Sequence, residues 1–137
     1  MKTEHKTTIP NQIYAKLESK YKVTLTRKEN RLPDNATHLY EPDVIVWDKK
    51  GLNILKIIEI ECDPIRKSII GAPILADYCL ALRQQSTKPE FYFIIYDENG
   101  IKQIKDFKAR IKVIGHYIKH IQTPIIGTPD QIYAQLV

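Results

Sequence analysis

Three carboxylates lie at the ends of two neighbouring apolar segments. Asp43 opens the run Val44–Trp47, whereas Glu59 and Glu61 close the run Ile54–Ile58. Acidic side chains are costly to bury unless something pairs with them. Residues two apart in a strand share a face, so Glu59 and Glu61 point the same way. If the two segments pair as strands, the three side chains converge on one point, which is typical of a cation site.

Carboxylate oxygens are the ligands that Mg²⁺ and Mn²⁺ prefer. Such a metal activates a water molecule and neutralises charge on a phosphate under attack. The pattern therefore predicts metal-dependent phosphodiester cleavage. Simpler readings exist for single residues: Asp43 can end a loop at a strand edge, and Glu61 can be a solvated strand end. Asp63 is interpreted as a helix N-cap in preference to a ligand.

The residues around this pattern predict alternating helices and strands. Asn11 is expected to cap a first helix, and Asp63–Pro64 has the residues of a second helix start. Gly71–Pro73 is expected to kink or interrupt that second helix. The predicted helices are 11–21, 63–84, 101–118 and 130–136, the last capped by Asp130, and the predicted strands are 23–27, 39–48, 52–62, 91–96 and 124–127, with a loop over 28–37.

The order helix, three strands, helix, strand, with acids at these strand ends, resembles the PD-(D/E)xK nuclease superfamily. That group includes restriction endonucleases, archaeal Holliday-junction resolvases and repair nucleases. The resemblance covers about Ile9 to Tyr96. It implies an α/β fold with a restriction endonuclease-like αβββαβ core, a central mixed sheet flanked by helices. The rest of the chain would be a C-terminal helix–strand–helix addition to a single domain, residues 1–137.

The resemblance also implies roles for individual residues. Pro42-Asp43 matches the first half of the motif, with Asp43 as the main metal ligand. Glu59 matches the second ligand, and the backbone carbonyl of Ile60 would complete the shell. Glu61 stands where the family usually has lysine. Some restriction enzymes of this superfamily carry glutamate there and remain active, so Glu61 is expected to bind a second metal or orient the attacking water.

A positive charge to replace the absent lysine is expected from Arg66 or Lys67, early in the second helix. Either would bind the substrate phosphate, with Lys67 as the catalytic cation; the alternative is a salt bridge to the acids. Glu18, late in the first helix, matches the place of a further acid in many members. Its alternative is an ordinary exposed helix residue.

Composition limits the function classes. The chain has 137 residues and a formal net charge of +5, which is compatible with a polyanion such as DNA. Its apolar runs are too short to span a membrane, and the polar N-terminus is not typical of a signal peptide. Two cysteines without metal spacing favour a reducing, cytoplasmic location. The small size favours a homodimer, or recognition of DNA structure such as a junction.

Together these observations predict an endonuclease that uses Mg²⁺ or Mn²⁺ to hydrolyse DNA. The main alternative is a catalytically inactive module of the same fold that binds DNA or a partner protein. A third reading is an accessory or viral-type protein whose acids support an assembly interface. A saturable metal site would separate the first reading from the second.

Overall fold

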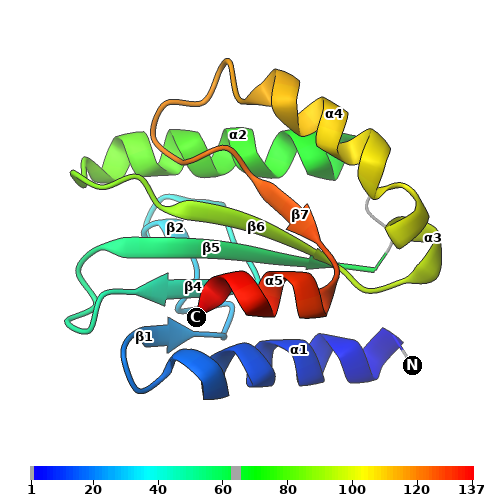
Figure 1. Ribbon diagram of the computed structural model, residues 1–137. Helices are drawn as coiled ribbons and strands as arrows, with labels where there is room; N and C mark the ends of the chain where they lie inside the picture. Colours follow the sequence, from blue (N-terminus) through cyan, green and yellow to red (C-terminus); the bar gives the residue numbers. More distant parts are fainter. Residues whose placement is uncertain (1, 63–65) are drawn as a thin grey trace.

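A five-stranded mixed sheet with helices on both faces forms the centre of the protein (Figure 1). The computed structural model describes the backbone of residues 2–62 and 66–137 and the side chains of residues 7–62 and 69–137. Its elements in chain order are α1 (Lys2–Leu17), β1 (Lys22–Thr24), β2 (Leu32–Pro33), β3 (His38–Tyr40), β4 (Val44–Trp47), β5 (Ile54–Glu61), α2 (Arg66–Arg83), β6 (Glu90–Ile95), α3 (Glu98–Lys102), α4 (Ile104–Ile114), β7 (Ile125–Gly127) and α5 (Pro129–Leu136). The predicted α/β class is confirmed.

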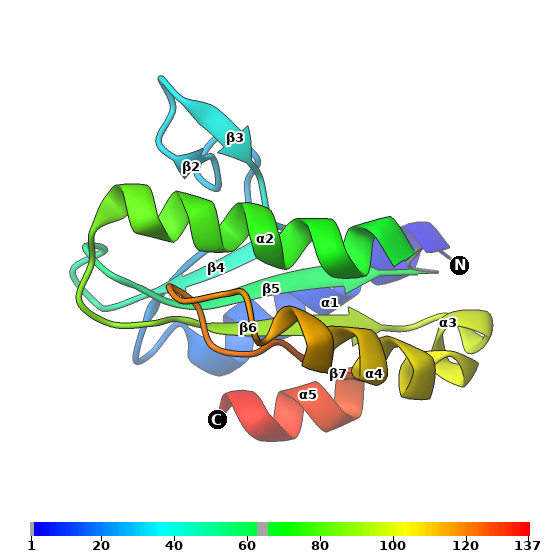
Figure 2. The same cartoon turned by 90° about the horizontal axis from the view of Figure 1, so that it is seen from above.

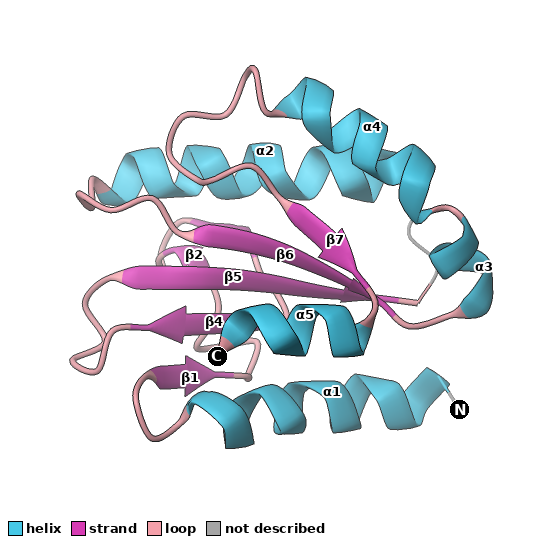
Figure 3. Ribbon diagram, in the orientation of Figure 1, coloured by secondary structure: helices cyan, strands magenta, loops and turns pink. Residues whose placement is uncertain are grey.

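Strand β5 lies at the centre of the sheet, whose order is β1-β4-β5-β6-β7. On one side, β5 pairs antiparallel with β4, which in turn pairs antiparallel with β1. On the other side, β5 pairs in parallel with β6, and β6 in parallel with β7. Antiparallel strands need only the turn at 48–53, whereas the parallel pair β5–β6 needs the long connection that α2 supplies. Figure 3 shows these elements by type.

Alternation along β5 sends its side chains into two separate cores. Ile57 packs beneath α2 and α4, and Ile58 packs against α1 and α5 on the opposite face (Figure 1). Both isoleucines are fully buried. The carboxyl end of β5 is therefore held rigidly from both sides, and the face of each later residue in this strand is fixed by the same alternation.

An arm, residues 25–41, projects from the sheet and carries β2 and β3 (Figure 2). The two strands pair antiparallel and contact α2. The predicted loop over 28–37 was wrong at β2, whose two residues are too few for a periodic signal. The predicted strand 39–48 is two strands, because Pro42 has no N–H to donate to a ladder and interrupts the pairing.

Helix boundaries differ from the predictions at several places. Helix α1 begins at Lys2 and runs through Pro10, although proline removes one backbone hydrogen bond. Burial of Ile9 and Ile13 against the sheet offsets that cost. Helix α2 likewise runs uninterrupted through Pro73. The predicted cap Asp63–Pro64 lies outside the described residues.

The C-terminal helices also differ in detail. The predicted helix 101–118 is two helices, α3 and α4, with Gln103 between them at φ −96° and ψ −1°. The cap of α5 is Thr128 instead of Asp130. The Gln131 N–H donates to Thr128 Oγ1 at 3.5 Å, and Gln131 Oε1 accepts from the Thr128 N–H at 3.0 Å. This reciprocal pair is a capping box, which satisfies two end groups at once.

A buried asparagine fixes the backbone that leads into β4. Asn30 is fully buried, and its Nδ2 donates to the carbonyls of Thr24, Pro42 and Asp43, each at 3.1 Å. Its Oδ1 accepts from Thr24 Oγ1 at 2.6 Å, and Trp47 Nε1 donates to the same hydroxyl at 2.9 Å. The side chain thus ties β1 to the segment that carries Asp43.

Replacing this amide should destabilise the fold more than an exposed change does. Asn30→Ala leaves buried carbonyls without donors, so we expect a loss of about 2–4 kcal/mol in unfolding free energy. Urea denaturation followed by circular dichroism measures it. Asn35→Ala, exposed on the arm, is the matched control and should change stability by less than about 0.5 kcal/mol. Equal effects of the two variants would contradict the assigned role of Asn30.

Candidate active site at the carboxyl end of β5

The three predicted carboxylates, Asp43, Glu59 and Glu61, lie together and form what we call the acid cluster. In β5, Glu59 and Glu61 lie on the same face of the strand as Ile57, the face beneath α2. Asp43 directly precedes β4, two residues before Ile45, which packs in the same core. The pairing of Val44 with Ile58 brings Asp43 alongside Glu59. The three carboxylates are therefore neighbours, as predicted, while their convergence on one cation stays a prediction.

Two hydrogen bonds lock the cluster to the backbone. Glu59 Oε1 accepts from the Asp43 N–H at 3.2 Å. In return, Asp43 Oδ2 accepts from the Ile60 N–H at 2.7 Å. These bonds extend the β4–β5 ladder by side chains beyond Val44. They hold each carboxylate against the backbone of the neighbouring strand segment.

Burial and like charges act together on Glu59. The pKa of its carboxyl is raised well above the usual range, first by burial and then by the negative charges of Asp43 and Glu61. Smaller opposing effects come from the Tyr40 hydroxyl and the Asp43 N–H. Without a cation, Glu59 therefore keeps its proton at a pH where an ordinary glutamate is ionised. Groups of this kind are concentrated at functional sites.

Tyr40 belongs to the site although the sequence did not indicate it. The side chain is buried, and its hydroxyl faces Glu59 outside ideal hydrogen-bonding geometry. Burial, followed by the charges of Glu59, Asp43 and Glu61, raises the pKa of Tyr40 well above its usual value. The hydroxyl thus stays protonated and available as a donor. The one available signal was its place at the start of Tyr40-Glu41-Pro42-Asp43.

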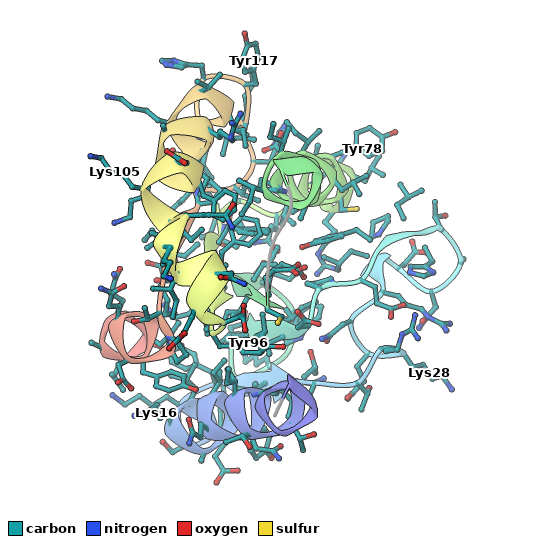
Figure 4. The ribbon with its side chains drawn as sticks, turned by 90° about the vertical axis from the view of Figure 1, so that its right-hand side faces the viewer. Lys16, Lys28, Tyr78, Tyr96, Lys105 and Tyr117 are labelled. Carbon is teal, nitrogen blue, oxygen red and sulfur yellow. The ribbon has the colours of Figure 1, made fainter. Side chains whose placement is uncertain are left out.

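Tyr96 is a second residue that the sequence analysis missed. It follows β6, and its N–H donates to the Glu61 carbonyl at 3.3 Å. Burial, then the Cys62 thiol and Glu61, raise the pKa of Tyr96 to about 12. Figure 4, which views the carboxyl ends of β5 and β6, shows Tyr96 near the middle of this end. Its position directly after an apolar run parallel to β5 was the usable signal.

The two residues that were predicted to supply positive charge lie at the start of α2, directly after β5. Helix α2 begins at Arg66, so Arg66 and Lys67 occupy its first turn on the cluster side of the sheet. Their side chains lie outside the described part, and their predicted roles stay predictions. Figure 4 shows α2 above this end of the sheet, α1 below it and the arm to the right.

Glu18 is not part of the cluster, and that prediction was wrong. Helix α1 runs antiparallel to β5, so its last turn lies at the far end of the sheet (Figure 1). The neighbouring Ser19 carbonyl accepts from Lys49 Nζ at 3.1 Å, in the turn between β4 and β5. Glu18 itself is exposed. A site role for Glu18 would require α1 to run parallel to β5, with its last turn near the acid cluster.

Glu41 is close to Asp43 in sequence but belongs to the arm. It forms an ion pair with Arg27, and its carboxylate lies 3.9 Å from Arg31 Nε and 3.1 Å from His38 Nε2. The hydrogen bond from Arg27 is the main cause that lowers the pKa of Glu41. The arm thus neutralises its own acid, and Glu41 adds no proton-binding group to the cluster.

The donor atoms suit a hard divalent cation, but they are not arranged as a finished shell. Among the described residues, no three His, Cys, Asp or Glu side chains converge as a metal-binding group. One oxygen of Asp43 is held by the Ile60 amide, and Glu59 favours its protonated form. A bound cation would take the place of that proton. Oxygen-only donors of this kind match Mg²⁺ or Mn²⁺.

No protein-family model, curated protein or solved structure matches the chain. The assignment of a function therefore depends on the geometry of the site. None of the helices in residues 2–62 and 66–137 has the length and apolarity needed to cross a membrane.

The raised pKa of Glu59 predicts an unusual pH dependence of stability. Since the native pKa of Glu59 is raised, the unfolded state binds fewer protons than the native state above about pH 4.5. Stability then falls as the pH rises through the window between the unfolded and native pKa values. Glu59→Gln removes this loss and should raise Tm by roughly 3–5 °C at pH 8, with no gain near pH 4. Thermal unfolding without divalent cations measures the difference.

The matched control for this measurement is Glu98→Gln, which changes an exposed glutamate in α3. Its melting curve should follow that of the parent chain at every pH. Parallel pH profiles for Glu59→Gln and the parent would show that Glu59 is ionised without penalty, against the assigned electrostatics.

Proposed function

We propose that this protein is a Mg²⁺- or Mn²⁺-dependent nuclease that hydrolyses phosphodiester bonds in DNA. The observation that carries the proposal is the acid cluster, with Asp43, Glu59 and Glu61 on one face at the carboxyl end of a central strand. Three acids held together in this way destabilise the metal-free fold. Selection for a bound cation is the simplest reason to keep them.

The order of elements supports kinship with the PD-(D/E)xK nucleases. Helix α1 is followed by the antiparallel set β1, β4 and β5, then by α2 and by β6 parallel to β5. This is the αβββαβ succession that the resemblance implies, with the arm inserted between β1 and β4. The acids stand at the start of the second core strand and the end of the third, as the motif requires.

The chain's own groups would divide the work of hydrolysis. Asp43 and Glu59 would hold the cation, which when bound activates water and polarises the phosphate. The Ile60 N–H points toward Asp43. The two polar groups of one strand residue point to the same side, so the Ile60 carbonyl faces Asp43 as well. Glu61 would orient the attacking water, and Tyr40 would position Glu59 through its protonated hydroxyl.

Positive charge for the DNA backbone would come from two directions. The first turn of α2 offers Arg66 and Lys67, as the sequence predicts. The arm adds Arg27, which is paired with Glu41, and Lys28; both are exposed, and Figure 4 shows Lys28 on the arm. A duplex or branched substrate would then lie across the start of α2 and the arm, with a phosphate over the acids. Contacts of this kind fix position without reading sequence.

A specific observation favours the second candidate, a non-catalytic module. Glu61 replaces the family lysine, and one Asp43 oxygen is occupied by a backbone amide. A chain that had lost the chemistry could keep the fold and the basic arm, and would bind DNA or a partner protein without cleaving it.

Asp43→Asn should abolish cleavage and leave the fold intact. Asparagine keeps an oxygen for the Ile60 amide but loses the charge that binds the cation, so we expect at least a 100-fold loss of rate. The assay incubates duplex, single-stranded and branched DNA with Mg²⁺ or Mn²⁺. Asp106→Asn, exposed on α4, is the control and should cleave like the parent.

Calorimetric titration with Mn²⁺ separates the two candidates. The nuclease requires one saturable site in the parent chain, lost in Asp43→Asn. Saturable binding without cleavage of any DNA, or no binding at all, would favour the non-catalytic module. Cleavage that persists unchanged in Asp43→Asn would remove the nuclease site from Asp43.

Removing one cation from each predicted phosphate contact should weaken DNA binding in a salt-dependent way. For Lys28→Ala with Lys67→Ala, the slope of log affinity against log salt should fall by about 2. Fluorescence anisotropy with Asp43→Asn as the background avoids cleavage. Lys105→Ala with Lys108→Ala is the control, because Lys105 lies on the opposite side of this view from Lys28 (Figure 4). An equal fall in the control would mean that only net charge matters.

A further inference from the structure

Helix α2 is apolar on both its inner and its outer face. Between Ile69 and Leu82, the only charged residue is Asp77. The inner face is fully buried in the core, at Ile69, Ala76, Cys79 and Leu80. A surface helix normally presents charged or polar residues to solvent opposite such a face. The outer face of α2 does not.

The one charged side chain of this segment, Asp77, is bound to the loop after α4 and does not add charge to the outer face. Asp77 Oδ1 accepts from the backbone N–H groups of Lys119 at 2.9 Å, of His120, and of Ile121 at 3.2 Å. The carboxylate therefore ties the loop after α4 to α2. Between Ile69 and Leu82, the outer face of α2 therefore presents only uncharged and mostly apolar side chains to solvent.

These side chains form one continuous surface, which we call the α2–α4 face. From the helical repeat, the outer residues of α2 span about 140° of its circumference. Seven large side chains that are 42–72% exposed make up the face: Ile70, Ile74, Leu75, Tyr78 and Leu82 of α2, with Val113 of α4 and the nearby Tyr117. Figure 4 shows Tyr78 and Tyr117 directed outward on this side of the molecule.

The face is shaped as well as apolar. Ile70 and Ile74 of α2 face Val113 and Tyr117 across a hollow of about 250 Å³, with Arg110 at its border. Beside it, a side chain added at Gly71 would meet nothing within 4 Å. The hollow and the bare glycine leave room for side chains from another molecule. A contiguous apolar patch with this shape distinguishes a binding surface from scattered surface residues.

We propose that a second copy of this chain covers the α2–α4 face, with α2 packed against α2 of the partner about a two-fold axis. The seven side chains offer on the order of 600 Å² of apolar surface, near the roughly 800 Å² that each partner buries in a standard interface. Leu75, Tyr78 and Leu82 recur three and four residues apart, the spacing of helix-to-helix packing.

Charge favours a second copy as the occupant. A two-fold axis sets each central residue beside its own counterpart, so a charged residue there would meet its like. Between Ile69 and Leu82 the outer face carries none, while the chain as a whole carries +5. Two copies therefore avoid repulsion by meeting through this face. The inference adds a stoichiometry of two acid clusters per particle, but it does not rest on the proposed nuclease.

Sedimentation equilibrium tests the dimer without any activity readout. The parent chain should sediment as twice its monomer mass. Ile74→Glu and Tyr78→Glu place two like charges near the axis and should raise the dissociation constant at least 100-fold. Leu52→Glu, at a side chain 65% exposed in the β4–β5 turn, is the matched control and should stay dimeric. Circular dichroism verifies that each variant is folded.

A second variant tests for the dimer without disrupting it. Tyr78→Cys lies near the expected axis and should form a partner-to-partner disulfide on mild oxidation, whereas Leu52→Cys should not. A parent chain that stays monomeric at high concentration would overturn the proposal. So would dimers that survive Tyr78→Glu, or a monomer that binds phosphatidylcholine–phosphatidylserine vesicles through Tyr78, which would assign the face to a membrane surface.

Discussion

Repulsion among three carboxylates is the constraint on which this structure depends. Glu59 is held beside Asp43 and Glu61, and its pKa is raised first by burial and then by the negative charges of these two acids. The surrounding structure opposes separation: two hydrogen bonds cross from β4 to β5, and Asn30 holds the backbone behind Asp43. A cluster that destabilises its own fold persists where something else benefits, and a proton or a divalent cation relieves the same repulsion.

The position of β5 explains why the cluster forms at this place. Strands on both sides and helices on both faces fix its carboxyl end, and the parallel partner β6 brings Tyr96 to the same edge. Loops that leave this edge can vary without disturbing the acids. The chain returns from the arm to the sheet at Asp43, and α2 follows β5 directly, so segments far apart in the chain meet around the acids. A rigid centre with variable borders is the usual arrangement of a functional site.

The sequence predicted what repeats along an element and missed what depends on the relation between elements. The shared face of Glu59 and Glu61 follows from the two-residue period of a strand, so it could be predicted. Tyr40 and Asn30 act through partners on other strands, and no local period marks them. Glu18 failed for a related reason: periodicity identifies the buried face of α1 but not its direction across the sheet. The predicted helix start at Asn11 was wrong, because α1 continues through Pro10, where burial of the neighbouring isoleucines outweighs one lost hydrogen bond.

The glutamate in place of lysine changes the charge balance that any mechanism must satisfy. Asp43, Glu59 and Glu61 together carry three negative charges when ionised, and one divalent cation neutralises two of them. The substrate phosphate then adds another negative charge at the same point. With lysine in the motif, that residue would supply the missing positive charge; with Glu61 the charge has to come from another group. In the proposed nuclease, Glu59 gives up its proton to the first cation, and either a second cation or the predicted Arg66 and Lys67 would meet the phosphate. The surroundings of Glu59 favour that exchange, because the conditions that raise its pKa also strengthen the attraction of its carboxylate for a nearby cation.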